Sequence, residues 1–87
     1  MVRRDRARIF AEILAAIVEE SKATGKAKIT RVQTKVYVPY DRFKQYLLVM
    51  RDKGLIEVGS LLITERGLKY LEEYKQIIKS LERFGLE

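Results

Sequence analysis

The chain has 87 residues, of which 47% are hydrophobic and 34% charged, and this composition argues against disorder and favours one soluble globular domain. Its net charge of +6 favours an anionic partner. It contains no cysteine and no histidine, which excludes disulfides, thiolate nucleophiles, Cys/His zinc sites and imidazole acid-base catalysis, and we expect neither a cofactor nor a metal. No apolar run approaches the roughly 20 residues of a transmembrane helix, and the basic N-terminus lacks the apolar core of a signal peptide, so a cytoplasmic protein is expected.

From about Asp5 to Ala23, apolar residues recur at steps of one, three and four, which predicts a helix with one face turned to the core. They are Ile9, Phe10, Ile13, Leu14, Ile17 and Val18. Thr24-Gly25 follows, and glycine readily takes the left-handed conformation that ends helices.

A short helix and a longer one are predicted next. Thr30 and Gln33 have the spacing of a capping box, which would start a second helix at Thr30. That helix must end before Val38, because the residue before Pro39 is pushed out of the helical region. Pro39 suits the first position of a third helix, which would stop at Lys53-Gly54. The apolar face of this third helix contains Phe43, Tyr46, Leu47 and Met50.

The hydrophobic period changes after Gly54. Residues 55–58 and 61–63 are rich in branched side chains and are separated by Gly59-Ser60, which predicts a small β-hairpin with a two-residue turn. Thr64 is a suitable N-cap for a last helix that would span roughly 30 Å. Gly67 within that helix predicts a close backbone approach to the hairpin or to a neighbouring helix.

This order of elements is that of a winged helix-turn-helix module. We therefore predict an α+β, mostly α fold with a short two-stranded wing and a long C-terminal helix. Residues 1–67 would form a winged-helix DNA-binding domain and residues 65–87 a dimerisation helix, together making one structural domain.

The stretch from Thr30 to Gly67 also resembles a known family. Its matching motifs are Thr30-Arg31-Val32, Tyr40-Asp41-Arg42-Phe43-Lys44-Gln45-Tyr46-Leu47, Lys53-Gly54-Leu55-Ile56-Glu57 and Ile63-Thr64-Glu65-Arg66-Gly67. In these it is similar to the archaeal winged-helix family of small basic chromatin-associated proteins, and the resemblance covers about half of the chain. It implies double-stranded DNA as the partner, a transcriptional or architectural role at the nucleoid, and a homodimer formed by an antiparallel coiled coil of C-terminal helices.

Two features depart from this family pattern. The wing is shorter than the family usually shows, and its tip at Gly59-Ser60 has no Lys or Arg for a phosphate contact. Pro39 stands where such proteins often have a capping serine.

Positive charge is concentrated in the first part of the chain. Residues 1–53 hold 13 Lys and Arg against 6 Asp and Glu, whereas residues 54–87 hold 5 against 6. A third helix in the major groove would offer Arg42 to guanine and Gln45 to adenine. The predicted phosphate contacts are Lys28, Arg31, Lys35 and Lys44.

Other basic and aromatic residues leave alternatives open. Tyr37 and Tyr40 could reach phosphates through their hydroxyls, and Tyr40 is included in the predicted interface, although packing of both rings in the core is the more ordinary role. The N-terminal arginines form either an arm that reaches the DNA or a solvated helix start. They are Arg3, Arg4, Arg6 and Arg8.

The last helix predicts an interface between two copies of the chain. The expected interface residues have heptad spacing and are Leu71, Tyr74, Ile78 and Leu81. The alternative is that this stripe packs against the first helix. Ile77 and Phe84 widen the stripe beyond what one neighbour would cover, which favours the homodimer.

Three other classes of function compete with DNA binding. A winged helix can serve as a protein interaction module without nucleic-acid binding, since a fold alone does not determine function. RNA binding lacks an aromatic-rich strand surface, and the remaining polar residues form no recognisable catalytic constellation. We therefore expect no enzyme, no small-molecule substrate and no membrane partner.

Overall fold

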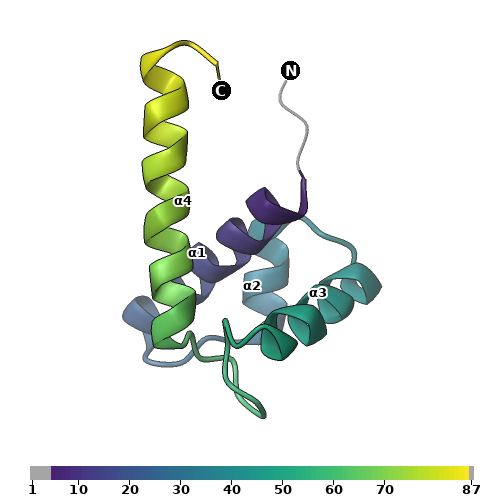
Figure 1. The fold of residues 1–87 in the computed structure, drawn as a ribbon. Coiled ribbons are helices and arrows are strands. Elements are labelled where there is room, and N and C mark those ends of the chain that lie inside the picture. Colours follow the sequence, from purple (N-terminus) through teal and green to yellow (C-terminus); the bar gives the residue numbers. More distant parts are fainter. Residues whose placement is uncertain (1–4, 87) are drawn as a thin grey trace.

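The computed structural model describes residues 5–86, which form four helices joined by loops (Figure 1). The helices are α1 (Arg6–Thr24), α2 (Ile29–Val36), α3 (Tyr40–Asp52) and α4 (Glu65–Arg83). α2 and the N-terminal half of α4 pack against α1, and α3 contributes buried residues to the same core, whereas the C-terminal half of α4 projects away (Figure 1). This projection gives the molecule extents of 40 × 26 × 26 Å.

The core is built mainly from the apolar face of α1. Asp5 caps this helix, since its Oδ1 accepts a hydrogen bond of 2.9 Å from the Arg8 backbone N–H. Gly25 ends it with a φ of 81°, as its position after the apolar stripe predicts. The largest fully buried side chains come from α1, α2, α3 and the wing: Ile13, Leu14, Ile17, Val32, Phe43, Met50 and Ile56.

The predicted capping box at the start of α2 is wrong. The helix begins at Ile29 with Lys28 as its N-cap, and the Thr30 hydroxyl therefore lies inside the first turn. The Gln33 side-chain amide instead donates a hydrogen bond of 2.9 Å to the Val38 carbonyl oxygen beyond the helix end. This bond ties α2 to the turn that leads into α3.

The turn between α2 and α3 consists of residues 37–39. Tyr37 lies in the left-handed region with a φ of 55° and ends α2, a position that usually favours glycine. Pro39 is the N-cap of α3 and not its first helical residue. This short turn joins α2 and α3 in the arrangement of a helix-turn-helix (Figure 1).

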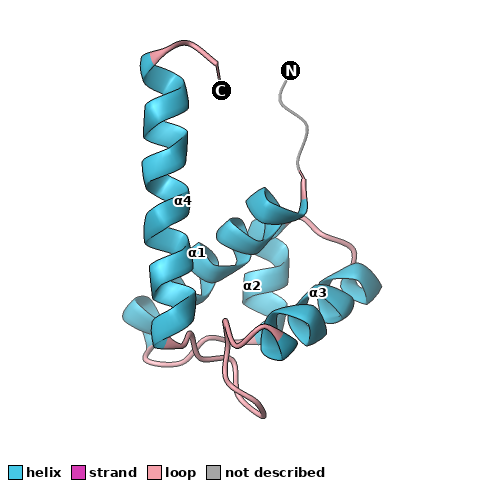
Figure 2. Cartoon of the chain, in the orientation of Figure 1, coloured by secondary structure: helices cyan, strands magenta, loops and turns pink. Residues whose placement is uncertain are grey.

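The predicted two-stranded wing is only partly formed, and no regular strand occurs among residues 5–86 (Figure 2). One antiparallel bridge joins Ile56 to Ile63, and the Glu57 N–H donates 2.9 Å to the Leu62 carbonyl oxygen. Residues 58–61 lie beyond that bond, so the tip is a four-residue loop and not the predicted two-residue turn. The wing is therefore a hairpin-shaped loop with a single bridge at its base.

The start of α4 is held against the wing as the sequence predicts. The Thr64 hydroxyl accepts from the Gly67 N–H at 3.0 Å and donates 2.6 Å to the Gly54 carbonyl oxygen at the end of α3. A Cβ added to Gly67 would overlap the Leu55 carbonyl oxygen and lie 2.7 Å from Cγ1 of Ile63. Gly67 thus allows the close approach that its place in the sequence predicts.

Candidate nucleic-acid interface

The first half of α3 presents the predicted base-contacting residues to solvent. Arg42 and Gln45 are both exposed, on the side of the helix opposite Phe43 and Leu47, which are buried in the core. The ammonium of Lys44 lies 5.4 Å from the centre of the Tyr40 ring, and half of the Tyr40 surface is exposed. α3 therefore offers one guanidinium, one ammonium and one amide on a face that no described residue covers.

The α2 cations lie beside two carboxylates at the end of α1. The Lys35 ammonium is 3.1 Å from Oε2 of Glu20 and 3.4 Å from Oε2 of Glu19, and Nη1 of Arg31 is 3.8 Å from Oε1 of Glu20. The hydrogen bond from Lys35 to Glu20 raises the pKa of Lys35 above its ordinary value of 10.5. Lys35 and Arg31 are thus already paired with anions, whereas Lys28 at the N-cap is exposed without such a pair among residues 5–86.

Glu20 is a residue of this site that the sequence reasoning missed. Its side chain is about 7% exposed, and Oε1 has no hydrogen-bond partner within the described part of the chain. A buried carboxylate without full hydrogen bonding is costly, which makes its two cationic neighbours important for its burial. The signal was present in the sequence, because Glu20 follows Ile13 and Ile17 at helical spacing and so falls within the apolar stripe of α1.

The two tyrosines near the turn are not in the core, contrary to the more ordinary role considered for them. Tyr37 is 85% exposed and Tyr40 is 50% exposed. The left-handed backbone of Tyr37 turns its ring outward from the corner between α2 and α3. Tyr37 is therefore exposed at the turn between α2 and α3, and Tyr40 is half-exposed beside Lys44 of α3.

The proposed N-terminal arm is described only in part. Arg3 and Arg4 lie outside the described residues. Arg6 lies 5.5 Å from the centre of the Phe10 ring, and the Arg8 Nε is 3.0 Å from Oε2 of Glu12 one helical turn away. Arg6 and Arg8 therefore belong to the first turns of α1, which corresponds to the helix-start alternative.

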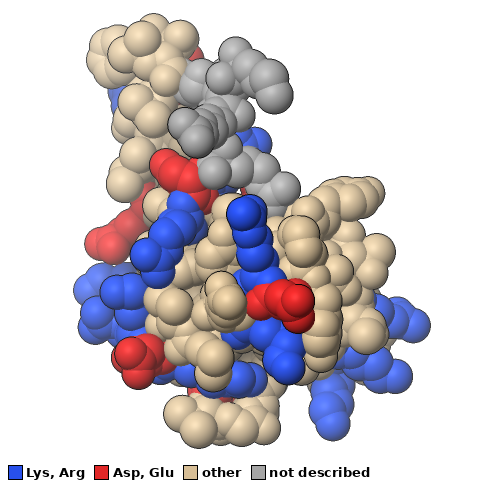
Figure 3. Space-filling model, turned by 90° about the vertical axis from the view of Figure 1, so that its right-hand side faces the viewer, with Lys and Arg blue, Asp and Glu red and all other residues tan. Residues whose placement is uncertain are grey.

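Seen from the side on which α3 lies, the surface carries basic side chains across most of its width, with few acidic ones among them (Figure 3). The tip of the wing shows no basic side chain, as its sequence predicts. This distribution gives the α3 side of the molecule a positive surface, which attracts polyanions.

The four residues of α4 that are predicted to form the dimer interface differ in how far they are buried. Leu71 is 7% exposed and belongs to the core of its own chain, which agrees with the alternative of packing against α1. Tyr74, Ile78 and Leu81 are half-buried, and an apolar groove of about 350 Å³ runs between α1 and α4 beside Tyr74 and Ile78. Further along the same helix, Ile77 and Phe84 are 57% and 74% exposed.

Residues 5–86 contain neither a membrane-spanning helix nor a cluster of metal ligands. No described helix is both long enough and apolar enough to cross a membrane. Within the same residues, no group of three or more acidic side chains is placed to hold a metal ion.

Comparison with known proteins agrees with this architecture. The family description of winged helix-turn-helix proteins matches residues 3–82, which is nearly the whole chain. The chain therefore belongs to the winged helix-turn-helix family. No curated protein and no solved structure matched the chain.

Proposed function

We propose that this protein binds double-stranded DNA as a homodimer, with α3 in the major groove and α2 on the phosphate backbone. It acts without a cofactor and without catalysis, as a transcription regulator or an architectural protein of the nucleoid, like the archaeal chromatin proteins its sequence resembles. The observation that carries the proposal is the exposed set on the helix-turn-helix of this winged fold, namely Lys28, Arg42, Lys44 and Gln45.

The chemistry of this set supports DNA as the partner. Arginine and glutamine can each form two hydrogen bonds with the major-groove edge of one base. The ammonium groups of Lys28 and Lys44 would neutralise phosphates on either side, and Tyr40 lies close enough to Lys44 to share that contact. Arg31 and Lys35 would contribute less than expected from sequence, because Glu19 and Glu20 already neutralise them.

The exposed part of α4 supports the dimer. Ile77 and Phe84 are exposed, and Ile78 and Leu81 are half-buried on a helix whose C-terminal half projects from the body (Figure 1). A continuous apolar surface of this kind is characteristic of an interface, and the same helix of a second copy has the matching surface. Residues 65–87 would then form the dimerisation segment, with Leu71 retained in the protomer core.

The proposal is tested by measuring the affinity for a random-sequence DNA duplex by fluorescence anisotropy at several salt concentrations. We expect the affinity to fall steeply as salt rises, because phosphate contacts release counterions. Arg42→Ala/Lys44→Ala should weaken binding at low salt by about tenfold or more, since both a base contact and a phosphate contact are removed.

The matched control is Lys22→Ala/Lys26→Ala, which removes two exposed cations at and just beyond the end of α1 and leaves α2, α3 and the proposed dimer segment intact. This variant should keep most of the affinity of the parent protein. Equal weakening by both pairs would mean that net charge alone drives binding and would overturn the placement of α3 in the groove. An absence of binding at low salt would instead favour a protein interaction module.

A further inference from the structure

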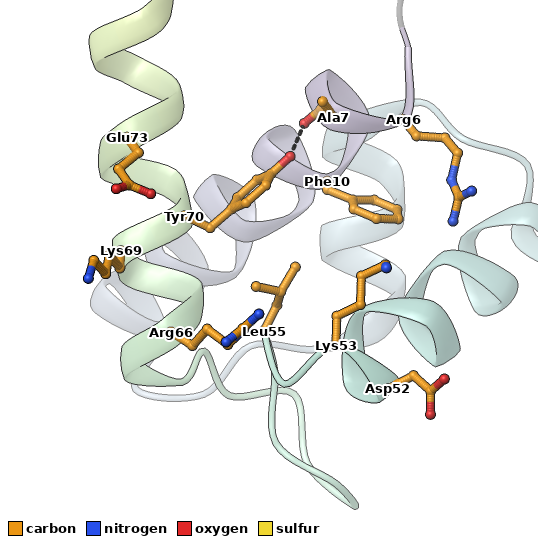
Figure 4. Close-up of a pocket in the computed structure, with 10 residues that line it drawn as sticks. All are labelled: Arg6, Ala7, Phe10, Asp52, Lys53, Leu55, Arg66, Lys69, Tyr70 and Glu73. Carbon is orange, nitrogen blue, oxygen red and sulfur yellow. Dashed lines mark hydrogen bonds between the residues drawn. The ribbon is translucent and has the colours of Figure 1, made fainter.

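A cavity of about 830 Å³ lies between the first turn of α1, the end of α3 and the start of α4 (Figure 4). It is separate from the exposed face of α3 that carries Arg42 and Gln45, since its α3 residues are Asp52 and the following Lys53 at the opposite end of the helix. The volume falls within the range of about 300–1,000 Å³ that is usual for small-molecule sites.

The inner wall of the cavity is apolar and fixed. Phe10 and Leu55 are each only 5% exposed and form its inner surface. The Tyr70 ring forms the α4 side, and its hydroxyl donates a hydrogen bond of 2.7 Å to the Ala7 carbonyl oxygen across the upper edge (Figure 4). An aromatic or aliphatic body placed against these three side chains would lose water on one face.

The edge of the cavity carries cations from three separate elements. Arg6 comes from the start of α1, Lys53 from the end of α3 and Arg66 from the first turn of α4. Lys69, one turn further along α4, points away from the cavity (Figure 4). The Arg66 side chain lies against Gly54, which directs its guanidinium across the cavity toward Leu55 (Figure 4). Lys53 extends upward to the Phe10 side of the same space (Figure 4).

Among residues 5–86, no carboxylate lies within ion-pair distance of Lys53 or Arg66. The two acidic residues of the cavity are Asp52 and Glu73, and Asp52 points away from it (Figure 4). Lys53 and Arg66 therefore present two cations to the apolar wall, against one remaining carboxylate of the lining, Glu73.

We propose that this cavity binds an amphipathic organic anion, a carboxylate, sulfonate or phosphate carried on an aromatic or aliphatic body. The body lies against Phe10, Leu55 and Tyr70, and the acid group lies between Lys53 and Arg66. A guanidinium and an ammonium from different elements can each form a charge-assisted hydrogen bond with one such group.

The probe for this site is 8-anilinonaphthalene-1-sulfonate, an aromatic sulfonate whose fluorescence rises on transfer from water, titrated into the full chain without DNA. We expect saturable binding to the parent protein and a loss of affinity of at least about tenfold in Lys53→Gln/Arg66→Gln, because two charge-assisted hydrogen bonds are removed. Ala7→Trp, which fills the cavity from α1 without changing any charge, should also weaken binding. Circular dichroism checks that both variants remain helical.

Lys22→Gln/Lys26→Gln is the matched control, with the same change of charge at exposed positions near the end of α1 that line neither the cavity nor the α4 groove. It should bind the sulfonate like the parent. The neutral analogue N-phenyl-1-naphthylamine should bind the parent and Lys53→Gln/Arg66→Gln equally.

Two results would overturn the proposal. One is unchanged sulfonate binding in both cavity variants, which would place the probe outside this cavity. The other is a loss of DNA affinity in Lys53→Gln/Arg66→Gln as large as in Arg42→Ala/Lys44→Ala, which would assign the cavity edge to the nucleic-acid interface. Because the titration uses no DNA, it can succeed or fail independently of the proposed function.

Discussion

Glu20 shows how one side chain can set the effective charge of a basic surface. Its carboxylate lies between Arg31 and Lys35 and is nearly fully buried. These two cations of α2, which count as free positive charge in the sequence, are therefore paired with an anion in the folded protein. In the proposed complex, DNA phosphates would therefore compete with an internal anion for these two cations. Counting lysines and arginines along the chain overestimates the contribution of α2 to polyanion binding.

The Glu20→Gln variant tests this competition. It keeps the size of the side chain and removes its charge, so DNA affinity at low salt should rise by about threefold to tenfold and the salt dependence should become steeper. The measurement is the same anisotropy titration. Glu72→Gln on the exposed face of α4 changes the net charge equally and serves as the control. An equal gain in both variants would contradict a specific role for Glu20.

Gly67 is a second residue with a strong local constraint. Alanine is the better helix former, yet its methyl group would overlap the Leu55 carbonyl oxygen and crowd Ile63. We expect Gly67→Ala to lower the free energy of unfolding by about 1–3 kcal/mol, because the wing and α4 must move apart. Urea unfolding followed by circular dichroism measures this, and the exposed Gln76→Ala should change stability by less than about 0.5 kcal/mol.

At the scale of the elements, a hydrogen bond between residues distant in sequence joins α1 to α4. The Tyr70 hydroxyl donates it to the Ala7 carbonyl oxygen. Burial, aided by the neighbouring Tyr74, raises the pKa of Tyr70 above its ordinary value of 10.0. The folded state therefore favours the protonated hydroxyl. The stability that this group contributes is present below about pH 10 and is lost as the pH rises through the raised pKa.

Tyr70→Phe is expected to lower the free energy of unfolding at neutral pH by about 0.5–1.5 kcal/mol, since one hydrogen bond is removed. The variant should also lose less stability than the parent between about pH 7 and pH 11, because it has no hydroxyl to ionise at this position. Urea unfolding at both pH values measures the two effects. The same alkaline loss in both proteins would show that Tyr70 does not contribute to it.

The helices were predictable because their signals are local. The first helix is predicted for residues 5–23 and observed as Arg6–Thr24, and Thr64 caps α4 as expected. The start of α2 was misplaced because Ile29 already takes helical geometry, which leaves Thr30 inside the helix. The strand content of the wing was overestimated. Branched residues favour strands, but the wing with its four-residue tip forms a single bridge.

The sites were less predictable than the helices, since they depend on contacts between distant segments. Exposure of Arg42 and Gln45 followed from the helical period, but pairing of Lys35 with Glu20 depends on how α2 packs on α1. The cavity beside Phe10 combines three elements that lie far apart in the sequence, so no spacing rule indicates it. The left-handed Tyr37 has no sequence signal, because glycine or asparagine is expected there.

At the scale of the whole molecule, the proposed dimer predicts a specific effect of charge on α4. Ile78→Glu/Leu81→Glu should convert a particle of twice the chain mass of 10.2 kDa into a monomer, because two carboxylates would be buried in an apolar interface. Light scattering after size-exclusion chromatography measures the mass. The control Gln76→Glu/Ser80→Glu adds the same charges at exposed positions of the same helix and should remain dimeric. A monomeric parent protein would contradict the dimer.

In the proposed dimer, the length of the projecting half of α4 would set the distance between the two DNA-binding surfaces. In the proposed dimer, the two DNA-binding surfaces are separated by helices whose length grows by 1.5 Å for each residue. Seven residues inserted into the projecting part would separate the surfaces by about 10 Å more, which is about three base pairs of DNA at 3.4 Å each. The preferred distance between half-sites would then be encoded in the length of α4, a part of the chain that touches no base.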